Sequence, residues 1–130
     1  MPVANGEFEV KLLPAPNASL TEGSGIGRMT LDKRYHGLLE AEGYGEFLSY
    51  RSSVPTSAVY VAIEKVTGTL EGRNGSFALQ HQGVMGGEFD GLRIIIVPDS
   101  GTDGLKGLRG KMDVRIEDGK HFYSLDYSFT

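Results

Sequence analysis

The chain has 130 residues, which suits one domain with its own core, and we treat residues 1–130 as that domain. Its 17 acidic and 13 basic residues are scattered and give a net charge of −4, which argues against a nucleic-acid partner. The lack of cysteine excludes disulfides and thiol chemistry, and no apolar run is long enough to span a membrane. The start, MPVANGEFEV, lacks the pattern of a signal peptide, so we expect a cytoplasmic protein with no membrane partner.

No window of the chain shows a helical apolar period, and β-rich runs alternate with turn signals instead. In chain order, these runs cover residues 6–13, 25–36, 38–51, 58–72, 76–85, 89–97, 107–117 and 120–129. The later runs are separated by SSVPTS, Asn74-Gly75, Gly86-Gly87, PDSGTDG and Asp118-Gly119. Consecutive hairpins imply sequential antiparallel neighbours, and closure removes exposed sheet edges. We therefore predict an all-β fold, an eight-stranded antiparallel closed barrel in up-and-down meander order.

The first hairpin, over residues 25–51, does not resolve from the sequence. A turn at His36-Gly37 pairs Lys33 with Glu40, but it also places Leu31 opposite Glu42, so neither face is uniformly apolar. The strand pairing and facing of this region stay open.

A two-residue turn at Asn74-Gly75 gives the next hairpin a defined register. It places His81 opposite Gly68 on an inner face with Phe77 and Leu79. Glu64 and Tyr60 share this face further along. At about 3.4 Å per residue, Glu64 then lies about 13 Å from His81, too far for a direct hydrogen bond.

The outer face of the same strand carries Val59, Val61 and Ile63, an apolar triplet that needs a cover. The N-terminal segment or a second subunit can supply it. We favour the second, and expect a homodimer or another homo-oligomer with these three residues at the interface.

The Asp118-Gly119 turn pairs Lys111 with Asp126 on one face. On the other, Val114 meets Tyr123 and Gly110 meets Tyr127. Complementary charges on one face and apolar pairs on the other are what a correct register produces.

Four runs, RMTLDKRYHG, LEAEGYGEFLS, YVAIEKVTGTLEGRNGSFALQHQGVM and GLKGLRGKMDVRIEDGKHFYSLDY, carry a resemblance across most of the chain. They are similar to an uncharacterised bacterial family of unknown function, grouped with allene-oxide-cyclase-like barrels. The resemblance implies an eight-stranded barrel, often oligomeric, and no established activity. The chain departs from the family pattern at Leu38, where an acidic residue is usual.

The candidate lumen residues are those that share the inner parity: Tyr60, Glu64, Phe77, Leu79, His81, Tyr123 and Tyr127. In one interpretation they line a ligand pocket, where desolvation raises the pKa of a Glu64 acid and lowers that of a His81 base. In the other they only fill the barrel, with each polar group hydrogen-bonded. Glu64 needs a partner, and Arg28, Lys33 and Arg34 are the available cations.

Nothing in the sequence indicates a cofactor, and the three histidines are not spaced as metal ligands. The leading hypothesis is non-covalent binding of a small, mainly apolar molecule in the lumen. The alternatives are an isomerase or cyclase that uses Glu64 as acid or base, and a filled barrel that acts only through protein–protein contacts. The identity of the catalytic residues, and whether a reaction occurs, stay open.

Overall fold

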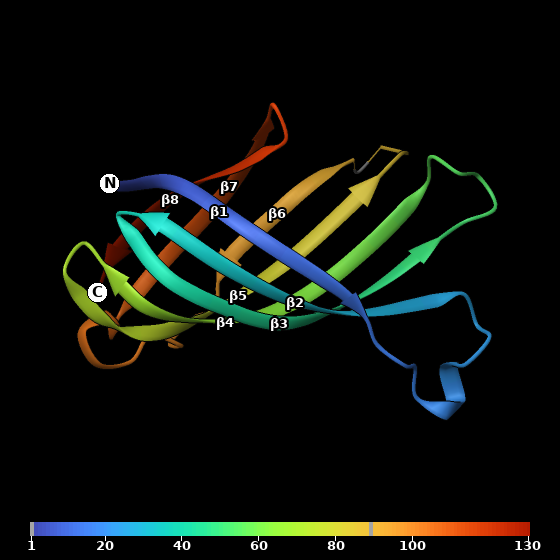
Figure 1. The fold of residues 1–130 in the computed structure, drawn as a ribbon, viewed down its shortest axis with the longest axis horizontal. Coiled ribbons are helices and arrows are strands. Elements are labelled where there is room, and N and C mark those ends of the chain that lie inside the picture. Colours follow the sequence, from blue (N-terminus) through green and yellow to red (C-terminus); the bar gives the residue numbers. More distant parts are fainter. Residues whose placement is uncertain (1, 89) are drawn as a thin grey trace.

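The computed structural model, which describes residues 2–88 and 90–130, is a closed antiparallel barrel of eight strands in meander order (Figure 1). Closure is completed by β1 pairing with both β2 and β8. The predicted fold is confirmed. The strands are β1 (Val3–Pro14), β2 (Ile26–Gly37), β3 (Leu39–Arg51), β4 (Ala58–Leu70), β5 (Arg73–Met85), β6 (Gly91–Ile96), β7 (Leu108–Glu117) and β8 (Lys120–Phe129).

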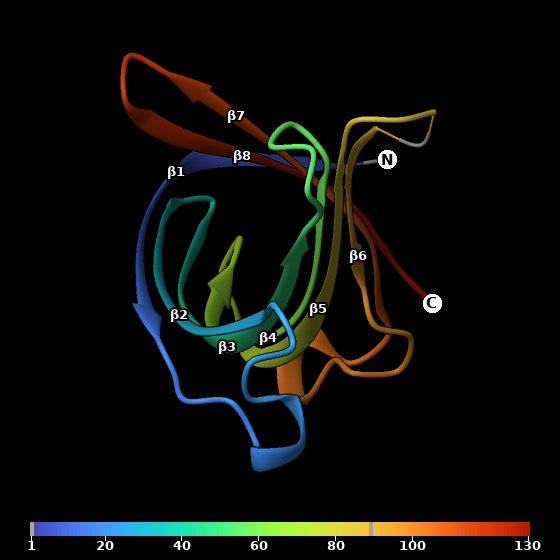
Figure 2. The same cartoon turned by 90° about the vertical axis from the view of Figure 1, so that its right-hand side faces the viewer.

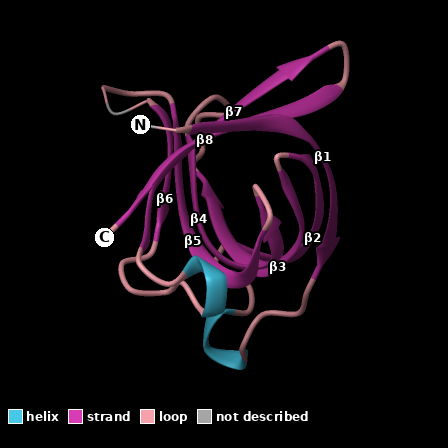
Figure 3. Ribbon diagram, turned by 90° about the vertical axis from the view of Figure 1, so that its left-hand side faces the viewer, coloured by secondary structure: helices cyan, strands magenta, loops and turns pink. Residues whose placement is uncertain are grey.

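Helix is limited, in the described residues, to two single 3-10 turns at Ser19–Thr21 and Asp103–Leu105 (Figure 3). Each lies in a connection, the first between β1 and β2 and the second between β6 and β7. In this part of the chain, no helix has the length and apolar character needed to cross a lipid bilayer.

The β7–β8 hairpin has the predicted register. Asp118 and Gly119 both have positive φ, 50° and 77°, as a two-residue hairpin turn requires. Lys111 pairs with Asp126 and Val114 with Tyr123. The tip of this hairpin extends beyond the body of the barrel (Figure 2).

The predicted turn at Asn74-Gly75 is wrong. The chain turns at Glu71-Gly72, where φ is 46° and 84°, and Gly68 pairs with Gly75 rather than with His81. Gly75 serves another purpose, because a Cβ there would overlap the carbonyl oxygen of Thr102 in the β6–β7 connection. The register moves by an even number of residues, so the assignment of side chains to the inner and outer faces survives.

The β2–β3 hairpin turns around Leu38 rather than at His36-Gly37, so Lys33 lies opposite Gly43 instead of Glu40. Tyr35, Lys33 and Leu31 therefore lie opposite Ala41, Gly43 and Gly45 on the inner face. Small residues on β3 leave room inside the barrel for the larger side chains of β2.

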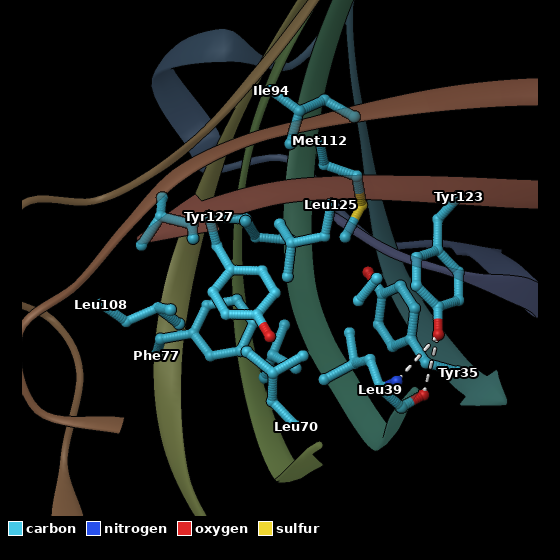
Figure 4. Packing of buried hydrophobic residues seen from close by; sticks show 14 of the residues in the cluster. Tyr35, Leu39, Leu70, Phe77, Ile94, Leu108, Met112, Tyr123, Leu125 and Tyr127 are labelled. Carbon is cyan, nitrogen blue, oxygen red and sulfur yellow. Dashed lines mark hydrogen bonds between the residues drawn. The ribbon is translucent and has the colours of Figure 1, made fainter. Parts of the chain in front are cut away.

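One end of the lumen is filled by a continuous apolar core (Figure 4). Tyr123 belongs to this core, and its hydroxyl donates to the carbonyl oxygen of His36 or Leu39 and accepts from the Leu39 N–H at 3.0 Å. The buried members of this core are Ala4, Phe8, Tyr35, Leu39, Val66, Leu70, Phe77, Leu79, Ile94, Ile96, Leu105, Leu108, Met112, Tyr123, Leu125 and Tyr127.

Candidate functional site

A buried charged cluster lies where the filled core ends. The Glu64 side chain, from β4, is fully buried, and its Oε1 accepts hydrogen bonds from Lys33 Nζ at 3.0 Å and His81 Nε2 at 2.8 Å. Its Oε2 accepts from the Tyr35 hydroxyl at 2.5 Å. Strands β2 and β5 thus contribute the three polar side chains that contact one carboxylate from β4.

The backbone makes space for this carboxylate at Gly43. Gly43 lies opposite Lys33 on β2 and Val66 on β4, and a Cβ there would overlap Glu64 Oε2. The corrected β4–β5 register places Glu64 opposite Leu79 and His81 opposite Ala62, so the two side chains are diagonal neighbours on one face. The expected separation of about 13 Å is therefore wrong.

Glu64 is a carboxylate in this environment. Burial alone raises its pKa, but the hydrogen bond from His81, the charge of Lys33 and the hydrogen bond from Tyr35 together lower it below the ordinary value. The raised pKa expected for Glu64 is thus wrong, because desolvation is outweighed. Burial, followed by the nearby Glu64 charge, raises the pKa of Tyr35 well above its ordinary value, so its hydroxyl stays a donor.

Lys33 is the cation that the sequence left open among three. Its side chain is 8% exposed, and Nζ lies 5.1 Å from the centre of the Phe8 ring as well as beside Glu64. Arg28 and Arg34 instead pair with Glu46 and Glu42 on the outer face.

A cavity of about 220 Å³ opens on the other side of the cluster, at the end of the barrel where β1, β3 and β5 end. Lys33 and His81 from the cluster are among its lining residues. The cavity is lined by Val10, Leu12, Leu31, Lys33, Phe47, Tyr60 and His81.

The Tyr60 ring lies over Gly83, where a Cβ would overlap it, and packs edge-on against Phe47 at a centroid distance of 5.7 Å. Both rings also border a second, more open groove of about 570 Å³, which reaches Met85 and Leu92. The cavity and the groove therefore share an aromatic wall, and a ligand longer than the cavity has an apolar surface to follow.

The seven predicted lumen residues all point into the barrel, but they divide into two groups. Tyr60 and His81 line the cavity, and Glu64 lies beneath it. Phe77, Leu79, Tyr123 and Tyr127 are buried in the filled core instead. The residues that the sequence did not single out are Val10, Leu12, Leu31 and Phe47, whose strands could not be paired or faced in advance.

Val59, Val61 and Ile63 are 47%, 52% and 58% exposed on the outer face of β4. On β3, Tyr50 lies opposite Val59 and Leu48 opposite Val61, and both are exposed as well. We call these five residues the outer patch. Its role as an interface stays a prediction.

In residues 2–88 and 90–130, no group of three or more His, Asp or Glu side chains is placed to hold a metal ion. His36 contacts Glu9 on the surface, and the His121 ring packs at a tilt against Phe8, so neither belongs to the His81 cluster.

Comparison with known proteins identifies relatives across the whole chain. Residues 4–127 match a family described as "Protein of unknown function (DUF3224)". A crystal structure of a protein of unknown function from the DUF3224 family of Shewanella oneidensis MR-1 superposes with a TM-score of 0.90. Its sequence is 48% identical, and the match covers 100% of this chain and 98% of that chain. A search of curated proteins finds no match. The resemblance to an uncharacterised bacterial family is confirmed, and the grouping with allene-oxide-cyclase-like barrels stays a prediction.

Proposed function

The chain belongs to the DUF3224 family of proteins of unknown function, and we propose that its barrel reversibly binds a small, neutral, amphipathic molecule. One observation carries the proposal: a largely apolar cavity of about 220 Å³ is lined in part by the side chains of Lys33 and His81. Ligand cavities are mostly apolar, with a few polar groups that fix orientation. A cavity of about 150 Å³ is already enough for benzene.

The charge balance of the cluster indicates the kind of head group. Lys33 and Glu64 form an ion pair, so the buried cluster has no net charge while His81 is neutral. A charged ligand head would add an uncompensated charge in a desolvated place, which is costly. A hydroxyl or carbonyl group, which can accept from Lys33, adds none.

The apolar body of the ligand would contact Leu12, Leu31 and Phe47, and a longer body would continue past Tyr60 into the open groove. Phe77 and Leu79, toward the other end of the barrel, are fully buried in the core and are not accessible to a ligand. In this proposal, one end of the lumen is a ligand pocket and the other end is filled by side chains.

A thermal-shift series with hexan-1-ol, hexanoate and hexylamine tests this function. We expect hexan-1-ol to raise the Tm in a concentration-dependent way, because it binds only the folded state. The two charged analogues of similar chain length should give a much smaller shift.

Leu12→Trp, which fills the cavity, should abolish the hexan-1-ol shift. Leu13→Trp is the matched control, since Leu13 is the next residue on β1, is 52% exposed and does not line the cavity. Equal shifts in both variants, or no shift with any of the three compounds, would exclude binding in the cavity.

We also propose that the outer patch joins two copies of the chain. Its five apolar side chains lie side by side across β3 and β4, and isolated surfaces of this kind usually mark protein contacts. Further along the same outer face, Lys65, Thr67 and Glu42 are polar.

A further inference from the structure

The hydrogen bond to Glu64 orients the His81 ring and leaves its other nitrogen free to accept a proton. Because Glu64 is ionised, Nε2 carries the proton of their 2.8 Å hydrogen bond, and Nδ1 of a neutral ring keeps its lone pair. Among the described residues, the His81 ring makes a single hydrogen bond, the one to Glu64. Across residues 2–88 and 90–130, Asp126 Oδ1 is the sole fully buried side-chain nitrogen or oxygen atom without a hydrogen-bond partner. His81 Nδ1, which has no such partner, is therefore not fully buried, and His81 lines the cavity.

Lys33 is arranged as a hydrogen-bond donor at the same cavity. Its ammonium group has three N–H donors, and the hydrogen bond to Glu64 uses one of them. Lys33 Nζ and His81 Nε2 contact the same Oε1 atom of Glu64, and both side chains line the same cavity.

We propose that this pocket catalyses proton transfer at the carbon next to a carbonyl group of a small, apolar ketone or aldehyde. The inference rests on the proposed ligand binding and extends it to a reaction. The carbonyl oxygen accepts a hydrogen bond from Lys33, which places the adjacent carbon toward His81.

In the forward step, the bond between the α-carbon and its hydrogen breaks, and His81 Nδ1 takes the proton. The electron pair forms the carbon–carbon double bond of an enolate, whose oxygen is stabilised by Lys33. Return of a proton from His81 to the α-carbon, or to a conjugated carbon, regenerates a neutral ketone and a neutral ring. No oxidant or other reactant is consumed.

The charges in the cluster suit each stage of this exchange. When His81 becomes an imidazolium, it lies against the Glu64 carboxylate, and the enolate lies against the Lys33 ammonium. The net charge is zero before and after the transfer, so no isolated charge is created in the apolar cavity. Glu64 is a positioning residue in this scheme, because its carboxylate is engaged by Lys33, Tyr35 and His81.

Deuterium exchange of cyclohexanone in D₂O, followed by proton NMR, tests the proposal. We expect the wild-type protein to remove the α-proton signals faster than buffer alone. His81→Gln should lower the protein-dependent rate by about 100-fold or more, the usual contribution of a general base. His36→Gln is the matched control, because His36 is exposed and outside the cavity, and it should retain the wild-type rate.

If His81→Gln does not fold, Leu12→Trp and Leu13→Trp test whether the exchange takes place in the cavity. Exchange should be lost in the first variant and retained in the second. Exchange that survives His81→Gln or Leu12→Trp would overturn the proposal.

Measuring both the Tm and the deuterium exchange of the same samples distinguishes binding from catalysis. Cyclohexanone that raises the Tm without any protein-dependent exchange would overturn the proton transfer and leave the proposed binding intact. If neither cyclohexanone nor hexan-1-ol raises the Tm, both proposals fail.

Discussion

His81 Nε2 lies 2.8 Å from Glu64 Oε1, although the two residues are not a cross-strand pair. They meet diagonally across β4 and β5, within reach because both side chains are long and face inward. This contact marks the boundary between the filled half of the barrel and the half that holds the cavity. The chemistry of the site depends on how firmly that carboxylate is held.

Removing one member of the buried ion pair should be costly. Glu64→Gln leaves the Lys33 ammonium, 8% exposed, without its counter-charge, and we expect a loss of about 3–5 kcal/mol in unfolding free energy. The double variant Glu64→Gln/Lys33→Met should recover part of this loss. Urea denaturation of the two single variants and the double variant measures the coupling. Additive losses would contradict a stabilising contact between these side chains.

The stability of the protein should fall in acid through Glu64. Its pKa in the folded state is below the ordinary value of about 4.5, so its ionised form stabilises the fold. This contribution is complete above pH 4.5 and is lost as the pH falls through the lower pKa of the folded state. Lys33→Met removes one cause of the lowered pKa.

Thermal unfolding of the wild type and of Lys33→Met across the acidic pH range tests whether ionised Glu64 stabilises the fold. The acid-induced loss of Tm should begin near pH 4.5 in both proteins, but in Lys33→Met it should be smaller and should end at a higher pH, because the folded-state pKa of Glu64 lies closer to its ordinary value. A Tm profile with the same midpoint in both proteins would show that Lys33 does not control the titration of Glu64.

Gly43→Ala should disturb the carboxylate directly. The added Cβ overlaps Glu64 Oε2, which also accepts from Tyr35, so the side chain has little freedom to move away. Overpacking of this kind costs about 1–3 kcal/mol. Gly27→Ala is the control, because the nearest atom there is the rotatable Ser49 Oγ. Equal Tm values for the two variants would count against a tightly held carboxylate.

If the outer patch is a dimer interface, a charge placed within it should prevent dimer formation. Val61→Asp places a charge among apolar side chains and should convert a dimer into monomers, as measured by light scattering. Thr67→Asp, on the outer face of the same strand but outside the patch, should leave the mass unchanged. A wild-type monomer, or a Val61→Asp protein of unchanged mass, would exclude this interface.

The sequence predicted the fold because its signals are local. The period-2 alternation and the Asp118-Gly119 turn act over a few residues, and both hold in the structure. The facing of Phe77, Leu79 and His81 also held, since an even register error leaves parity unchanged. The turn at Asn74-Gly75 failed because Asn-Gly was read as a hairpin turn, whereas Gly75 is needed for contact with a distant loop.

The site was harder to predict because it combines residues from different hairpins. Lys33 reaches Glu64 only if β2 and β3 pair around Leu38, and the space for the carboxylate comes from Gly43 on a third strand. The sequence left Lys33 equivalent to Arg28 and Arg34, whose surface partners were not visible in the pattern. The sign of the Glu64 pKa shift depended on those same unseen contacts.

Nitrogen NMR of protein labelled with ¹⁵N-histidine distinguishes the two tautomers of the His81 ring. We expect a neutral His81 ring protonated at Nε2, and we expect hexan-1-ol to shift the signal of its unprotonated Nδ1, while His36 and His121 do not respond. A His81 ring protonated at Nδ1 instead, or an Nδ1 signal that hexan-1-ol leaves unchanged, would contradict this expectation.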